Sequence, residues 1–115
     1  MKLSKITFIV SLAVAANSLA VAQAETLIPR STSGDKGRYY LLEMDKKGDI
    51  VTTIHKRVGV SYTGYTKTEI NCKTQNIRVL GYSEESPSAI KTKPTEWFSL
   101  VPGSSKSDLV NFVCK

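Results

Sequence analysis

The sequence has little of what catalysis, metal binding and cofactor binding require. Its 115 residues include one histidine, two cysteines and one tryptophan. No serine, cysteine or acid stands at a recognised catalytic spacing from His55, so a triad has no support. Two cysteines and one distant histidine cannot complete a tetrahedral zinc shell. The acids Glu84 and Glu85 are neighbours in a proline-flanked stretch that is typical of solvated loops. We therefore expect no catalytic residue, no metal, no cofactor and no enzymatic activity.

An uninterrupted apolar run long enough for a membrane span is also missing. The longest run, residues 6–16, is shorter than the roughly 20 residues that a span needs. It follows Lys2 and Lys5 and precedes the small-x-small sequence Ala22-Gln23-Ala24, which is the pattern of a signal peptide cleaved before Glu25. A single N-terminal anchor is the alternative. With no cysteine near the cleavage site to accept a lipid, we expect an exported protein, periplasmic or secreted, without a stable membrane anchor after cleavage.

Charge of one sign is not concentrated anywhere in the chain. The formal charge of +6 includes Lys2 and Lys5, so residues 25–115 carry +4, with acids spread between the basic residues. Such a pattern is typical of a solvated surface and argues against nucleic acid as a partner. Weak attraction to anionic cell-surface polymers is still compatible with it. We expect a protein or a cell-surface macromolecule as the partner.

The two cysteines, Cys72 and Cys114, fit the needs of one small exported domain. Residues 25–115 are near the size at which a hydrophobic core alone becomes marginal. A bridge between the cysteines would close a loop of about 40 residues and contribute roughly 4 kcal/mol in the chain-entropy model. Free thiols are the alternative, which an oxidising compartment disfavours. We expect the disulfide to form.

Most of the chain shows strand patterns separated by turns. Residues 38–44 and 50–54 are rich in aromatic and β-branched types and flank turn residues 45–49, which predicts a hairpin whose second strand can continue to Val58. In residues 67–72 the side chains of Thr68, Ile70 and Cys72 alternate with polar ones, as in a half-buried antiparallel strand. Residues 77–82 return as its partner after a turn at 73–76.

The ends of the domain show weaker patterns. We expect an edge strand at 26–28, a polar linker at 31–35, and a regular structure that begins near Gly37. Near the C-terminus, Ser105 and Asp108 resemble a helix cap, and Leu109, Phe112 and Val113 share one helical face. The predicted fold is α+β: an antiparallel sheet of about five to six strands, with one C-terminal helix packed on it and disulfide-linked to it. His55 is expected on the strand surface and Trp97 in the core.

With these segments in order, the chain resembles the surface-adhesin protein E family of bacterial envelope proteins. The resemblance covers most of residues 25–115 and is carried by an Asn-Cys strand, a tryptophan, a Pro-Gly-Ser turn and a Phe-Val-Cys helix end: Asn71-Cys72, Trp97, Pro102-Gly103-Ser104 and Phe112-Val113-Cys114. It implies an antiparallel sheet with a packed helix, and a disulfide between the two matched cysteines. It also implies binding of host matrix or serum proteins and allows a homodimer. The lipidation cysteine of the family's named member is missing here.

The sequence is compatible with two alternative functions. The first is an exported envelope or surface binding protein, and the alternative is a soluble periplasmic accessory or inhibitor protein, for example of a lysozyme-type enzyme. Binding loops on a rigid scaffold usually carry the contacts. We therefore expect Tyr62 and Tyr65, which bracket Gly64, and the loop 84–94 with Glu84 and Glu85 to contact the partner. Tyr39 and Tyr40 are further candidates for a contact surface.

Overall fold

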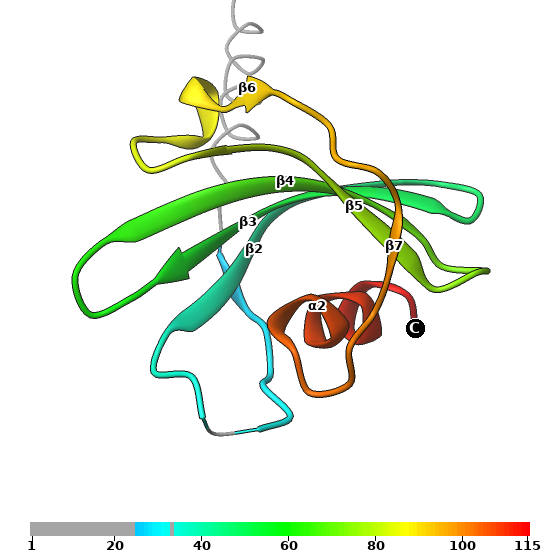
Figure 1. The fold of residues 1–115 in the computed structure, drawn as a ribbon, viewed down its shortest axis with the longest axis horizontal. Coiled ribbons are helices and arrows are strands. Elements are labelled where there is room, and N and C mark those ends of the chain that lie inside the picture. The colour runs from blue at the N-terminus through cyan, green and yellow to red at the C-terminus, as the bar shows by residue number, and fades with distance from the viewer. Residues whose placement is uncertain (1–24, 33) are drawn as a thin grey trace, which may run out of the picture.

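The computed structural model describes residues 25–32 and 34–115, which form one twisted antiparallel sheet with a helix on one face (Figure 1). The predicted signal peptide, residues 1–24, lies outside the described residues. In the described part, no helix has both the length and the apolar character needed to cross a membrane. The α+β prediction, with a sheet and one C-terminal helix, is confirmed.

The sheet is built from four long strands and three short ones. The long strands are β2 (Arg38–Lys47), β3 (Ile50–Val58), β4 (Thr63–Asn71) and β5 (Asn76–Ser83). The short strands and the two helical elements complete the chain: β1 (Thr26–Leu27), the 3-10 turn η2 (Pro87–Ala89), β6 (Lys91–Thr92), β7 (Phe98–Ser99) and α2 (Ser105–Val113). The seven strands are one more than the sequence predicted, because β6 and β7 are separate two-residue pairings with β5.

Both predicted hairpins are confirmed. Strands follow the order β1-β2-β3-β4-β5-β6, with β7 also paired to β5, and all pairs are antiparallel. The register of β3 and β4 is unbroken from Ile50↔Asn71 to Val58↔Thr63. It shifts by one residue between β2 and β3, and again between β4 and β5. Such bulges increase the twist of a sheet.

The core lies between α2 and one end of the sheet face. Val51, Ile70 and Ile77 stand side by side on β3, β4 and β5 and are fully buried. They face the apolar side of α2, formed by Leu109, Val110 and Val113. Fully burying an aliphatic side chain contributes about 1.5–3 kcal/mol. A nine-residue helix is marginal alone, so this contact is what keeps α2 folded.

The disulfide between Cys72 and Cys114 joins the C-terminal end of α2 to the end of β4. Its sulfur atoms are 2.03 Å apart and its Cα atoms 5.5 Å apart. Both cysteines pack against the apolar core. The predicted bridge is therefore confirmed, and Thr68, Ile70 and Cys72 face the core as the alternation indicated.

The ends of the domain follow the prediction in part. The edge strand expected at 26–28 is confirmed as β1, and the first long strand begins at Arg38, next to the expected Gly37. Ile28 is only 2% exposed and its N–H donates to the carbonyl of Tyr39, so residues before Gly37 already pack on the sheet. The helix is capped one residue earlier than predicted, because the side chain of Ser104, not Ser105, accepts the N–H of Ser107 at 3.1 Å.

Trp97 does not fill the core as predicted. It is 38% exposed, and the guanidinium of Arg78 lies over its ring, 5.0 Å from the centroid. Arg78 in turn pairs with Glu69 at 2.7 Å. Helix α2 covers the apolar end of the sheet face, and Trp97 is not among the residues that pack against this core.

Candidate functional site

Helix α2 covers only part of the sheet face, and strand β3 shows where the cover ends. Its inward-facing residues alternate with outward-facing ones and run from apolar to charged: Val51, Thr53, His55 and Arg57. Val51 and Thr53 are buried beneath the helix, and the hydroxyl of Thr53 shares a 2.6 Å hydrogen bond with that of Thr68. Beyond this bond, the face is polar and partly open.

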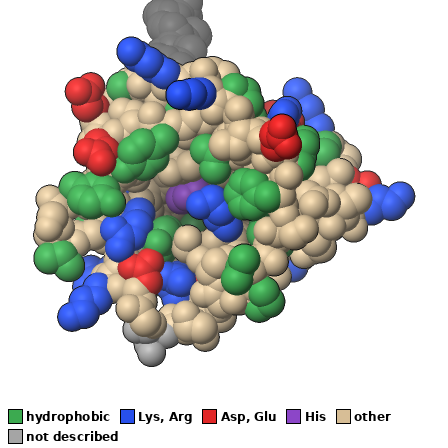
Figure 2. Space-filling model, in the orientation of Figure 1, with side chains coloured by type: hydrophobic (Ala, Val, Ile, Leu, Met, Phe, Trp, Pro, Cys, Tyr) green, Lys and Arg blue, Asp and Glu red, His purple; other side chains and the backbone are tan. Residues whose placement is uncertain are grey.

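The open part forms a small hollow of about 140 Å³ between the sheet and the N-terminal end of α2. Its lining combines three tyrosines, the inward residues of β3 and β4, and the start of the helix: Tyr39, His55, Arg57, Tyr62, Gly64, Thr66, Tyr82, Ser105 and Lys106. Figure 2 shows the imidazole of His55, the only histidine of the chain, at the floor of this hollow. The hollow collects three of the five tyrosines and two cationic side chains at one place.

His55 is the most unusual group of the site. It is 8% exposed, so its expected place on the strand surface was wrong, and β3 instead turns it toward the space beside α2. Its Nδ1 is buried and has no hydrogen-bond partner among the described residues. Burial, and next the positive charge of Lys106, lower the pKa of His55 from 6.5 to about 4. The imidazole is therefore neutral at physiological pH, with unused hydrogen-bonding capacity.

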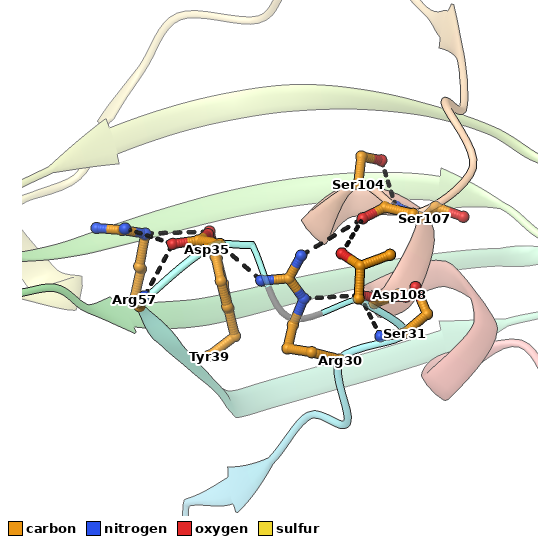
Figure 3. A network of polar contacts seen from close by, with 11 residues as sticks. Arg30, Ser31, Asp35, Tyr39, Arg57, Ser104, Ser107 and Asp108 are labelled. Carbon is orange, nitrogen blue, oxygen red and sulfur yellow. Dashed lines mark hydrogen bonds and ion pairs between the residues drawn. The ribbon is translucent and has the colours of Figure 1, made fainter.

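Arg57 is held rigidly beside the imidazole. Its guanidinium donates to Asp35 at 2.8 Å and to the hydroxyl of Tyr39 at 3.0 Å, and that hydroxyl donates to Asp35 at 2.5 Å (Figure 3). A Cβ on Gly37 would come within 2.5 Å of the guanidinium, so only glycine leaves room for it there. Hydrogen bonds from Arg57, Tyr39 and the N–H of Gly37 hold the pKa of Asp35 far below its usual range.

A second ion pair fixes the N-terminal end of α2 over the sheet. Asp108 accepts hydrogen bonds from Arg30 at 2.7 Å and from the N–H of Ser31 at 3.1 Å (Figure 3). Burial alone would raise the pKa of Asp108, but these two donors outweigh it and keep the pKa below its ordinary value. Arg30 also reaches Asp35 at 3.3 Å, which links the two ion pairs into one network. The network positions both Arg57 and the helix residues of the hollow.

Tyr82 forms one wall of the hollow by lying over Gly64. A Cβ on Gly64 would come within 2.5 Å of the Tyr82 hydroxyl, so the ring can approach the backbone only at a glycine. The hydroxyl donates to Glu84 at 3.3 Å. Burial, and next the charge of Glu84, raise the pKa of Tyr82. Tyr82 is 47% exposed and Tyr62 is 52% exposed, so both also form an aromatic rim.

The structure separates the side chains predicted to contact a partner. Tyr62 lines the hollow, and Glu84 reaches it through Tyr82. Tyr65 lies within β4 and not in a loop, and because its neighbour Thr66 lines the hollow, Tyr65 points to the opposite face. The N–H of Glu85 donates to the Ser83 side chain at 3.0 Å, outside the residues that line the hollow.

The predicted loop 84–94 contains more structure than expected. Residues 87–89 form η2, and residues 91–92 form β6 against Gly81 and Tyr82 of β5. Tyr40 shares its cross-strand row with Lys56 and Tyr65 on the opposite face, whereas Tyr39 is buried. The five tyrosines are thus divided between the two faces of the sheet.

Sequence reasoning missed six members of the hollow, of which His55, Arg57, Tyr82 and Lys106 give it its chemical character; the other two are Thr66 and Ser105. A signal for two of them was present, because alternation along 50–58 places His55 and Arg57 on the same face as Val51 and Thr53. No local pattern indicates Lys106, which reaches the hollow only because α2 packs across the sheet.

Comparisons of the chain with protein-family models, with curated proteins and with solved structures found no match. The described residues hold no group of three or more His, Cys, Asp or Glu side chains arranged to bind a metal ion. What the site offers chemically is a neutral imidazole, a free ammonium group, a paired guanidinium and two exposed aromatic rings.

Proposed function

We propose that the protein is an exported binding protein that engages a protein partner through the hollow and its tyrosine rim, without turning that partner over. The observation that carries this proposal is the placement of Tyr62 and Tyr82, about half exposed, around a buried imidazole whose Nδ1 has no hydrogen-bond partner among the described residues. The resemblance to surface-adhesin protein E supports an adhesin-type role toward host matrix or serum proteins. The disulfide supports an oxidising location, periplasmic or outside the cell.

Exposed tyrosines on rigid elements suit protein recognition. A tyrosine offers a large contact area at a low cost in side-chain entropy and carries a hydroxyl that can form a hydrogen bond. The ring of Tyr82 lies against Gly64, and its hydroxyl donates to Glu84. The backbone carbonyl of Tyr62 accepts a 2.9 Å hydrogen bond from the N–H of Gly59. Both rings are therefore attached to ordered backbone, which reduces the conformational entropy that is lost on binding.

The opposite face provides a matched control. Tyr40 and Tyr65 flank Lys56 there, and the ammonium of Lys56 lies 5.2 Å from the centroid of the Tyr40 ring and 2.6 Å from Glu25. This face has aromatic groups too, but its central cation is already paired. Two double variants with equal loss of tyrosine therefore separate the two faces.

The test is capture of purified proteins by immobilised residues 25–115. The panel contains matrix proteins, serum proteins and a lysozyme, and binding is measured by surface plasmon resonance together with lysozyme activity. We expect the variant Tyr62→Ala/Tyr82→Ala to bind its partner at least tenfold more weakly, because truncating a tyrosine that is a hot spot of an interface costs about 2 kcal/mol or more. We expect Tyr40→Ala/Tyr65→Ala to bind as the unmodified protein does.

The outcome also separates the two functional classes. Capture of a matrix or serum protein supports the adhesin-type role, whereas inhibition of the lysozyme supports the accessory or inhibitor role. Loss of capture in Tyr40→Ala/Tyr65→Ala alone would place the contact on the opposite face and contradict the use of the hollow. Saturable binding to no member of the panel would contradict the proposed function.

A further inference from the structure

The hollow carries more positive than negative charge, and one cation in it is free. Lys106 forms no ion pair among the described residues, in contrast to Arg57, which pairs with Asp35 at 2.8 Å. Ser105 and Lys106 are the first two residues of α2, so the positive end of the helix dipole also points toward this end of the sheet. Burial is the main reason for the lowered pKa of His55, and the positive charge of Lys106 lowers it further.

We infer that the hollow binds one carboxylate group of the partner, with its oxygens toward Lys106 and His55 and its aliphatic stem between Tyr62 and Tyr82. The inference rests on the proposed function, since it names the chemistry that the bound partner must offer. That group is an acidic side chain or a C-terminal carboxylate, which share the same chemistry.

The charges of the surrounding elements favour a single negative charge. Helix α2 contributes Lys106 and β3 contributes Arg57, while Asp35 neutralises Arg57 and Glu84 sits behind Tyr82. With His55 neutral and Arg57 paired with Asp35, Lys106 is the one lining residue whose positive charge has no paired acid among the described residues. A monoanion matches this charge, whereas a doubly charged phosphate would be undercompensated and repelled by the two nearby acids.

The buried imidazole is what makes the hollow a specific site and not only a positive surface. The unpartnered Nδ1 sits in a side chain that is more than nine-tenths buried. His55 lines the hollow, so a carboxylate bound there acts on the ring in two ways. It accepts a hydrogen bond from the ring, and its charge favours the protonated ring. The aromatic walls then exclude water from this contact, which strengthens it.

The single histidine makes the binding directly observable. In residues 25–115 labelled with ¹⁵N-histidine, the ring nitrogens of His55 give the only imidazole signals. The probes are propionate, N-acetyl-glutamate amide and N-acetyl-alanine, with propionamide as the neutral analogue and inorganic phosphate as the dianion. We expect the three carboxylates to shift the ring signals saturably and to raise the pH at which the ring titrates by about one unit, which equals a tenfold preference for the protonated ring. Propionamide should cause no saturable shift.

Variants at Lys106 test the role of the free ammonium. Lys106→Met keeps the length of the side chain but removes its charge, and we expect it to weaken propionate binding at least tenfold. Lys106→Arg should restore most of it. Lys47→Met is the matched control, because this substitution removes the same net charge from a side chain that is 83% exposed at the tip of the β2–β3 hairpin.

The outcomes distinguish this inference from the proposed function. Binding of N-acetyl-glutamate amide or of N-acetyl-alanine supports it and identifies the source of the carboxylate as a side chain or a chain end. Tighter binding of phosphate than of propionate, or equal propionate binding by Lys106→Met and Lys47→Met, would overturn it. Partner capture that depends on Tyr62 and Tyr82 but not on Lys106 leaves the proposed function standing and removes the inference. Propionate binding without any partner capture would support the carboxylate site and contradict the proposed function.

Discussion

The hydroxyl groups of Thr53 and Thr68 lie 2.6 Å apart between β3 and β4, at the boundary between two different halves of one sheet face. On one side of this pair, Val51 and Ile70 are fully buried under α2. On the other side, His55 and Thr66 line the hollow. A pair of buried threonines that share a hydrogen bond is a suitable junction, because each hydroxyl oxygen has a partner within the sheet.

The pH dependence of stability should reveal the buried imidazole. The pKa of His55 falls from 6.5 to about 4 on folding, so between these values the unfolded chain binds a proton that the folded chain does not. Stability should therefore decrease as the pH falls from about 6.5 to about 4, on the order of 3 kcal/mol in total. Urea unfolding at a series of pH values measures this. The variant His55→Gln should lack the decrease in this window, and an equal decrease in both proteins would contradict the assignment.

Below pH 4, a second loss of stability should follow from the carboxylates of the network. The pKa values of Asp35 and Asp108 are both lowered in the folded protein, so their contribution is complete above the unfolded value near 3.9 and disappears as the pH falls through the folded values. His55→Gln should retain this second loss, because it concerns different groups.

Breaking the ion pair at the start of α2 should be costly. The side chain of Asp108 is 4% exposed, and Asp108→Asn would leave the guanidinium of Arg30 without its closest charged partner. Losing one member of a buried pair typically costs about 3–5 kcal/mol. The matched control is Asp45→Asn, whose pair with Lys47 spans 3.9 Å and is exposed, so it should cost less than about 1 kcal/mol. Thermal and urea unfolding compare the two, and similar losses would contradict the assigned role of Asp108.

Removal of the disulfide should destabilise the domain without changing the sheet. Cys72→Ser and Cys114→Ser should each lower the free energy of unfolding by roughly 2–5 kcal/mol. The unmodified protein under reducing conditions serves as the comparison, because its two thiols occupy the same space. A reduced protein as stable as the oxidised one would show that the core alone holds α2 in place.

A methyl group at Gly64 should affect binding more than stability. In Gly64→Ala, the new Cβ would lie within 2.5 Å of the Tyr82 hydroxyl, and because this is the far end of the side chain, the ring can swing outward. We expect a stability loss below about 1 kcal/mol but weaker partner capture, because one wall of the hollow moves. Gly34→Ala, with no atom within 4 Å of the new Cβ, is the control. Equal capture by both variants would show that Tyr82 need not rest on Gly64.

The elements that could be predicted from the sequence are those fixed by neighbouring residues. Alternation predicted both hairpins and the inward direction of Thr68 and Ile70, and the spacing of Leu109 and Val113 predicted the buried face of α2. Gly64 was interpreted as a loop residue because glycine is rare in strands, but here it makes room for Tyr82.

The candidate site depends on contacts that no local pattern contains. Arg30 and Asp108 are 78 residues apart, and Asp108 was taken as part of a local cap when its carboxylate in fact binds the beginning of the domain. Lys106 meets His55 only through the packing of α2 on the sheet. The alternation that placed Val51 inward also applies to His55, but a histidine is compatible with either face, and only the three-dimensional structure shows that it is buried.

The disulfide also has a mechanical consequence. A pulling force applied between the two ends of the domain would pass through β1 to β4, reach Cys72 and cross directly to Cys114, bypassing the chain between two residues 42 positions apart. The part beyond Cys72 is thereby shielded from tension and holds Tyr82 and Lys106, whereas His55 and Arg57 belong to the extensible part. Tension would pull His55 and Arg57 away from Tyr82 and Lys106 while the covalent loop stays intact, so a stretched molecule would lose the hollow before the loop between the two cysteines unfolds.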